Sequence, residues 1–74
     1  MNYRDRITMS PDVMLGKPAI KGTRITVEFV IKKLSEGMDI DELLNEYSSL
    51  ERDDILASLA YSADVISKEE ILVS

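Results

Sequence analysis

The sequence predicts a mainly α fold, in which a three-helix bundle of the helix-turn-helix type follows a short β-hairpin or β-arch. Three observations support this prediction. Apolar residues recur at helical spacing in three segments after residue 26. The turns between these segments are short, as in helix-turn-helix domains. Residues 7–25 instead combine β-branched residues with proline and glycine in turn-forming positions.

The chain of 74 residues is long enough for one small domain. We divide it into a flexible arm at 1–6, a β element at 7–25, a three-helix core at 26–66 and a C-terminal extension at 67–74. Domains of this size usually need disulfides, a metal ion or a partner subunit for stability. The sequence has no Cys and no His, which removes the disulfides and the usual ligands of soft metals. We therefore expect a homodimer.

The β element begins with a strand expected at 7–9, where β-branched residues stand, and the turn-forming run 10–12 ends it. The segment 16–25 then contains two glycines, one proline and three cations. Gly22 can adopt a positive φ at little cost, so a tight turn can form there. The cations flank this turn, which makes the segment the best candidate for contact with an anionic partner.

The first two helices have recognisable ends. Thr26 is suited to cap the first helix, and Gly37 to end it. Asp39, with Glu42 three residues later, resembles a capping box at the start of the second helix. The second helix then presents a one-sided apolar stripe of Ile40, Leu43, Leu44 and Tyr47.

The third helix is expected from about residue 51 to residue 65. The residues that we expect it to bury are Ile55, Leu56, Leu59, Ala60 and Ala63. Asp53 and Asp54 stand in its first turn, where carboxylates interact favourably with the helix dipole. Adjacent helical positions point about 100° apart. We therefore interpret the two residues as a solvated helix start rather than as a metal-binding or acid–base pair.

Charge is distributed unevenly along this acidic chain, whose net charge is −5. Residues 1–33 hold seven cations against three carboxylates, and residues 34–74 hold two cations against eleven carboxylates. This asymmetry suggests one face that meets phosphate and another that meets water or a basic partner. The alternative is that the segregation is accidental, as it often is in short soluble proteins.

Composition argues against catalysis. Without His or Cys the chain offers no imidazole base and no thiol nucleophile, so we expect no enzyme activity, no cofactor and no metal. A carboxylate-dependent enzyme ranks well below the binding hypotheses. The sequence has no apolar run long enough for a signal peptide or a membrane span. We therefore expect a cytoplasmic protein that does not bind membranes.

The predicted DNA-binding residues are the cations of the first half together with one arginine of the third helix: Lys17, Lys21, Arg24, Lys32, Lys33 and Arg52. An alternative for Arg24 is an ion pair with Asp54 or Asp64 that fixes the β element to the helices. The alternative for the lysines is a solvated surface. Tyr47 and Tyr61 are interpreted as core or interface aromatics.

A resemblance to a known family rests on several of these residues together. The pattern Gly-x-Pro-x-Ile-x-Gly-Thr-Arg-Ile occupies 16–25, and Leu-x-x-Tyr-x-x-Leu follows at 44–50. Asp-Ile-x-x-x-Leu-x-Tyr completes the pattern at 54–61. The region from Ile7 to Tyr61 resembles the domain-of-unknown-function family number 433, whose members are small prokaryotic proteins. The resemblance implies a homeodomain-like helix-turn-helix fold. The chain departs from the family pattern at Ser48, where the family often has Pro, and at Glu51, where it often has Thr or Ser, so we expect Ser48 or Ser49 to cap the third helix instead.

The resemblance also implies an antitoxin of a type II toxin–antitoxin module. Such a protein would neutralise a PIN-like ribonuclease toxin by direct binding and would bind operator DNA as a dimer. The residues that we expect to contact the partner lie near the C-terminal end of the sequence: Glu69, Glu70, Ile71, Leu72 and Val73. The alternative function is a non-catalytic protein-interaction module without DNA binding, because the carboxylates at the start of the third helix would repel phosphate.

Overall fold

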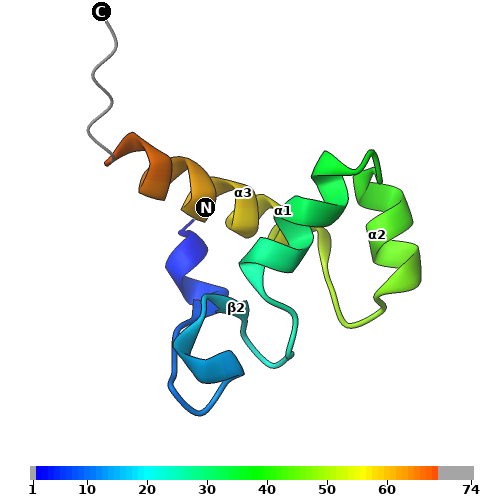
Figure 1. Cartoon of the computed structure of the whole chain (residues 1–74). Helices are drawn as coiled ribbons and strands as arrows, with labels where there is room; N and C mark the ends of the chain where they lie inside the picture. The colour runs from blue at the N-terminus through cyan, green and yellow to red at the C-terminus, as the bar shows by residue number, and fades with distance from the viewer. Residues whose placement is uncertain (1, 69–74) are drawn as a thin grey trace, which may run out of the picture.

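Three helices and a small β element make up the protein, as a computed structural model describes it for residues 2–68. The elements in chain order are the 3-10 turn η1 (Tyr3–Asp5), strand β1 (Ile7–Thr8), the 3-10 turn η2 (Met14–Gly16), strand β2 (Ala19–Ile20) and helices α1 (Val27–Ser35), α2 (Ile40–Glu46) and α3 (Arg52–Ser67). The β element lies beside one end of the helices (Figure 1). The mainly α fold preceded by a β-hairpin is thus confirmed.

The two short strands form an antiparallel pair in which Ile7 lies opposite Ile20 and Thr8 lies opposite Ala19. Ala19 also forms an isolated antiparallel bridge with Thr26, directly before α1. Ile7 and Ile20 are both buried and belong to the hydrophobic core. The hairpin is therefore a wall of the helical core and not an appendage to it.

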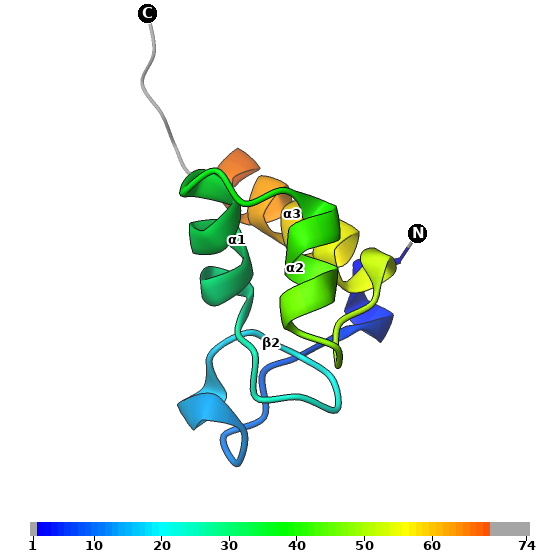
Figure 2. The same ribbon diagram turned by 90° about the vertical axis from the view of Figure 1, so that its right-hand side faces the viewer.

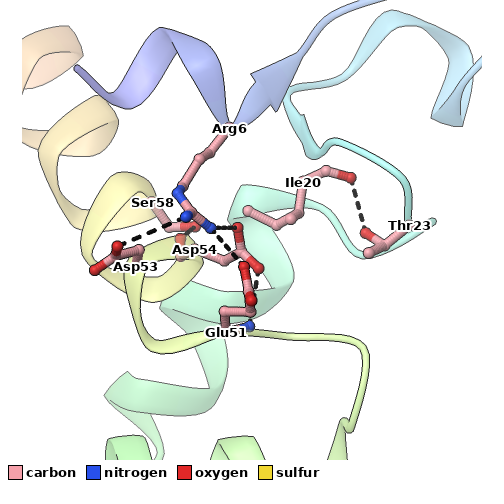
Figure 3. Close-up of polar contacts among 7 residues, drawn as sticks. All are labelled: Arg6, Ile20, Thr23, Glu51, Asp53, Asp54 and Ser58. Carbon is pink, nitrogen blue, oxygen red and sulfur yellow. Dashed lines mark hydrogen bonds and ion pairs between the residues drawn. The ribbon is translucent and has the colours of Figure 1, made fainter. Parts of the chain in front are cut away.

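The tight turn predicted around Gly22 is present and is closed by Thr23. Gly22 has a φ of +79°, and the backbone N–H of Thr23 donates to the carbonyl of Ile20 at 3.1 Å. The Thr23 hydroxyl donates to the same carbonyl at 2.9 Å (Figure 3), and it accepts from the N–H of Ile25 at 3.0 Å. Gly22 and Thr23 therefore shape the backbone. Arg24 is the residue of this Gly-Thr-Arg element whose side chain remains available to contact a partner.

A left-handed turn precedes this segment. Met14, Leu15 and Gly16 have φ values of 48°, 58° and 83°, and Gly16 donates its N–H to the carbonyl of Val13 at 3.0 Å. The side chain of Leu15 is 93% exposed at the tip of the turn. A side chain in the left-handed region costs roughly 1–2 kcal/mol, and no burial of Leu15 offsets that cost.

Replacing Leu15 by glycine is expected to raise the free energy of unfolding by about 0.5–1 kcal/mol, because glycine adopts this φ without the Cβ clash. Urea denaturation measures the change. Leu15→Ala is the matched control, since it keeps the Cβ and removes only the exposed part of the side chain. Equal stabilities of the two variants would contradict the strain argument.

The caps of the first two helices are those that the sequence predicted. Thr26 Oγ1 accepts from the N–H of Phe29 at 3.0 Å, and α1 ends before Gly37, whose φ is +99°. Asp39 accepts from the N–H of Glu42 at 2.9 Å, and Glu42 accepts from the N–H of Asp39 at 3.1 Å. This reciprocal pair satisfies two N–H groups that the first turn of α2 would leave unpaired.

The core lies where all three helices meet the hairpin. α1 and α2 run side by side and pack against α3 (Figure 2). The largest fully buried apolar side chains of the core are Ile20, Val30, Leu43 and Ile55. Tyr47 and Tyr61 pack against this cluster while half-buried, which confirms their interpretation as core aromatics. None of the helices within residues 2–68 combines the length and the apolar character that crossing a lipid bilayer requires.

The predicted buried face of α3 is wrong for four of its five residues. Ile55 is fully buried, but Leu56 and Leu59 are 40% and 41% exposed, and Ala60 and Ala63 are exposed. The face that points inward instead carries Asp54, Ala57 and Ser58 beside Ile55. The Ser58 hydroxyl donates to the carbonyl of Asp54 at 2.9 Å, so this polar side chain is buried with its hydrogen bond made.

Candidate functional site

Arg6 holds the start of α3 through three carboxylates. Its Nη1 lies 2.9 Å from Glu51 Oε1 and 3.0 Å from Asp54 Oδ1, and its Nη2 lies 3.6 Å from Asp53 Oδ2 (Figure 3). The hydrogen bond to Glu51, then that to Asp54, raises the pKa of Arg6. Asp54 Oδ2 also accepts from the backbone N–H of Glu51 at 2.9 Å. Arg6 and the three carboxylates already pair with one another, so this cluster joins Arg6 to the start of α3 and is not a ligand site.

Two predictions for the start of α3 are therefore wrong. Asp54 is buried and paired, not part of a solvated helix start, because Arg6 neutralises it. The N-cap of α3 is Glu51, and neither Ser48 nor Ser49 takes that position. For Asp54 the deciding group is Arg6, 48 residues earlier in the chain. The cap at Glu51 is local, since Asp54 three residues later accepts from its backbone N–H.

The first residues form a packed segment. Tyr3 meets Tyr61 edge to face, with ring centroids 5.7 Å apart, and its hydroxyl donates to Asp64 Oδ2 at 2.6 Å. Arg6 adds the contacts to the start of α3. The prediction of a flexible arm at 1–6 is thus wrong for residues 2–6, which lie against α3.

The Tyr3–Asp64 hydrogen bond shifts the pKa of both groups. It lowers the pKa of Asp64, with a further contribution from Lys68, and raises the pKa of Tyr3. Because the native pKa of Asp64 lies below its unfolded value, Asp64 stabilises the fold above about pH 4 and loses this contribution as the pH falls further. Because the native pKa of Tyr3 lies above its unfolded value, its contribution is complete below about pH 10 and is lost at higher pH.

The variant Tyr3→Phe is expected to flatten both limbs of the stability curve. Between about pH 5 and pH 2, and again above about pH 10, its free energy of unfolding should change less with pH than that of the native chain. Urea titrations at a series of pH values give these slopes. Tyr47→Phe serves as the control and should leave them unchanged. Parallel curves for Tyr3→Phe and the native chain would contradict the linkage.

Half of the cations predicted to contact DNA form ion pairs. These pairs join Lys17 to Glu28 at 3.5 Å, Lys33 to Glu36 at 3.7 Å and Arg52 to Asp41 at 2.7 Å. All three pairs are at least partly exposed and contribute little to stability. Their main effect is to reduce the positive charge available to a phosphate backbone.

The structure brings two of the predicted residues together. Lys17 and Arg24 line one hollow on the β element, together with Asp12 and the exposed Leu15. Arg24 is exposed and forms no ion pair within residues 2–68. The alternative that Arg24 pairs with Asp54 or Asp64 is wrong, because Arg6 holds Asp54 and both Tyr3 and Lys68 hold Asp64.

The other predicted cations lie elsewhere. Lys21 lines a separate hollow among the carboxylates that surround Arg6. Lys32 lies on α1, at the edge of a groove that faces α3. The six residues therefore do not form one patch. The sequence located the cations but not their partners. Lys17 and Arg24 lie together on the β element, where Lys17 also pairs with Glu28, and we call these two residues the basic corner.

An apolar groove of about 510 Å³ runs between α1 and the C-terminal half of α3. Its apolar lining consists of Pro18, Val27, Ile31, Tyr61, Val65 and Ile66. Val65 and Ile66 are 42% and 55% exposed. The groove reaches the end of α3, where the chain continues into residues 69–74. The predicted partner-binding residues, Glu69 to Val73, lie outside the described residues 2–68.

Carboxylates gather on α2 and on the segments that flank it. The exposed members are Asp39, Asp41, Glu42, Glu46, Glu51 and Asp53. No group of three or more carboxylates within residues 2–68 is arranged to hold a metal ion. The surface is thus acidic over the second helix and apolar in the α1–α3 groove, and these two regions are candidates for contact with a protein.

Comparisons with known proteins agree with this fold. A family model described as "Protein of unknown function (DUF433)" matches residues 7–62. The chain is similar to the crystal structure of a DUF433 member protein from Anabaena variabilis, with a TM-score of 0.80, 28% identity, and coverage of 88% of this chain and 64% of that one. It is also 30% identical over 59 residues to the uncharacterized protein y4eO of Sinorhizobium fredii. That match covers 80% of this chain but only 27% of the relative's length.

Proposed function

Because the chain belongs to the DUF433 family of proteins of unknown function, we propose a role that its surface supports: a non-catalytic antitoxin. In this role it binds and neutralises a PIN-like ribonuclease toxin. The observation that carries the proposal is the apolar groove between α1 and α3. Exposed apolar surface of this kind marks protein-binding sites.

The groove suits a partner that supplies an apolar helix or strand. Tyr61 supplies an aromatic wall, and Val65 and Ile66 supply aliphatic side chains that a bound partner would cover. Buried aromatic and aliphatic anchors of this type carry most of the energy of protein interfaces. Residues 69–74 follow α3 directly in the sequence, and Ile71, Leu72 and Val73 among them are apolar.

The acidic surface supports a nuclease as the partner. A nuclease binds its polyanionic substrate in a cationic groove, and carboxylates on α2 can occupy such a groove by charge complementarity. This attraction accelerates association and weakens with salt. Binding that strengthens at low salt would accord with this arrangement.

Co-expression with the product of the neighbouring gene tests the proposal. The expected result is a stable complex in which the toxin's ribonuclease activity is lost. Ile66→Asp places a charge in the groove and should weaken the complex at least about 10-fold. Leu15→Asp is the matched control, because Leu15 is exposed but lies on the β element. No association, or equal affinities of the two variants, would count against the groove as the toxin site.

Operator DNA binding is the second proposed activity, and the basic corner favours it. Lys17 and Arg24 face one hollow beside an exposed apolar side chain, Leu15. Minor-groove proteins combine such cations with an apolar wedge. A gel-shift titration against the upstream DNA at several salt concentrations should show that Arg24→Ala weakens binding, whereas Arg52→Ala does not. No shift at low salt would favour a protein-interaction module without DNA binding.

A further inference from the structure

One face of α3 is apolar although it points away from the core. Leu56 and Leu59 are 40% and 41% exposed, and Ala60 and Ala63 are exposed beside them. Their spacing of three and four residues aligns them in one stripe along the helix. We call these four residues the α3 stripe. It lies opposite the inward face that carries Asp54, Ile55 and Ser58.

We propose that the α3 stripe is a homodimer interface, in which α3 packs antiparallel against α3 of a second copy. Reversing the helix direction about the midpoint between residues 59 and 60 places Leu56 opposite Ala63 of the second copy. The same operation places Leu59 opposite Ala60 of the second copy. Each large side chain thus meets a small one, which lets two helices approach closely and fill the space between them.

Charges at the two ends of α3 support the same orientation. The antiparallel order brings the start of the helix, with Glu51 and Asp53, to the end of the second helix, which carries Lys68. These side chains pair with Arg6 and Asp64 in their own subunit but remain 74%, 56% and 70% exposed to a second copy. Arg52, which pairs with Asp41 in its own subunit and is 55% exposed, then lies near Ser67 of the second copy, where the last carbonyls of the helix carry partial negative charge. A parallel pair would instead bring the acidic helix starts together and the two Arg52 side chains close to each other.

A second copy is also an occupant that suits a small domain. A domain of this size gains stability by covering apolar surface with a partner subunit. The stripe runs through a helix of 16 residues, about 24 Å long. It leaves the α1–α3 groove and the basic corner free for other partners. The dimer therefore does not depend on toxin or DNA binding.

The mass in solution tests the interface. Sedimentation equilibrium or light scattering of the native chain should give twice the chain mass of 8.3 kDa. Leu59→Glu should raise the dimer dissociation constant at least about 100-fold, while circular dichroism confirms that the helices remain. Leu15→Glu is the control, since Leu15 is 93% exposed and lies outside the stripe. A monomeric native chain, or a Leu59→Glu variant that dimerises as well as the control, would overturn the proposal.

Disulfide trapping tests the orientation. The native chain has no Cys, so introduced cysteines report one contact each. The double variant Leu56→Cys/Ala63→Cys should form a covalent dimer under mild oxidation, because each substituted position faces the other in the second copy. The single variant Leu56→Cys should not do so. Efficient trapping of the single variant would indicate a parallel pair and overturn the antiparallel arrangement.

Discussion

Replacing Arg6 by alanine is expected to lower the melting temperature by about 10 °C or more. The side chain of Asp54 is only 8% exposed, and the substitution removes its cationic partner while the carboxylate stays buried. An unpaired buried charge destabilises a protein far more than the pair itself stabilises it. The same substitution also frees Glu51 and Asp53, so three carboxylates would then repel one another at the start of α3.

Arg52→Ala is the matched control for Arg6→Ala. It breaks an ion pair of 2.7 Å, which is shorter than the contacts of Arg6, but its two side chains are 55% and 81% exposed. We expect a change of no more than about 1 kcal/mol in the free energy of unfolding. The double variant Arg6→Ala/Asp54→Ala should recover part of the loss, because no buried carboxylate remains. Equal losses for Arg6→Ala and Arg52→Ala would mean that burial of Asp54 does not matter.

Ile55→Ala is expected to reduce the free energy of unfolding by about 3 kcal/mol. Ile55 is fully buried in the core, where α3 meets the other helices. The substitution removes buried methyl groups and leaves a cavity that the surrounding helices cannot fill completely. Urea denaturation followed by circular dichroism measures the loss.

Ile66→Ala makes the same chemical change on the same helix, but Ile66 is 55% exposed. It should cost less than about 1 kcal/mol. The ratio of the stability losses of Ile55→Ala and Ile66→Ala therefore shows how α3 is rotated about its axis. Similar losses would place both isoleucines in comparable surroundings and would contradict the rotation described here.

The sequence predicted the features that depend on neighbouring residues. Thr26, the Asp39–Glu42 pair and the turn at Gly22 each act within a few residues of chain, so their geometry follows from local rules. Helix number and type were also predictable, because apolar residues recur at helical spacing. These features account for the elements and their ends.

The rotation of α3 could not be predicted in this way. It depends on Arg6, which is separated from Asp54 by 48 residues, and on Tyr3, which is separated from Asp64 by 61 residues. These contacts draw a polar face of the helix inward, whereas a reading of periodicity assigns the leucines to the core. Such pairing between distant residues leaves no periodic signal in the sequence.

The candidate site was only partly predictable for the same reason. The sequence identified Lys17 and Arg24, which do meet on the β element. It did not reveal that Arg52 is held by Asp41 or that Lys21 lies among carboxylates. The α1–α3 groove was missed altogether, because its walls come from three separate segments of the chain. The signal in the sequence that points toward it is the apolar pair Val65 and Ile66 at the end of the third helix.

The segment 2–6 braces α3, the longest helix, at two points. Tyr3 donates a hydrogen bond to Asp64, and Arg6 donates one to Asp54, which precedes Asp64 by ten residues on the same helix. Tyr61 has Tyr3 on one flank and the α1–α3 groove on the other. Removal of this segment by proteolysis, or its displacement by a ligand that binds Arg6, would therefore loosen one wall of the groove. Neither change involves contact with the groove itself.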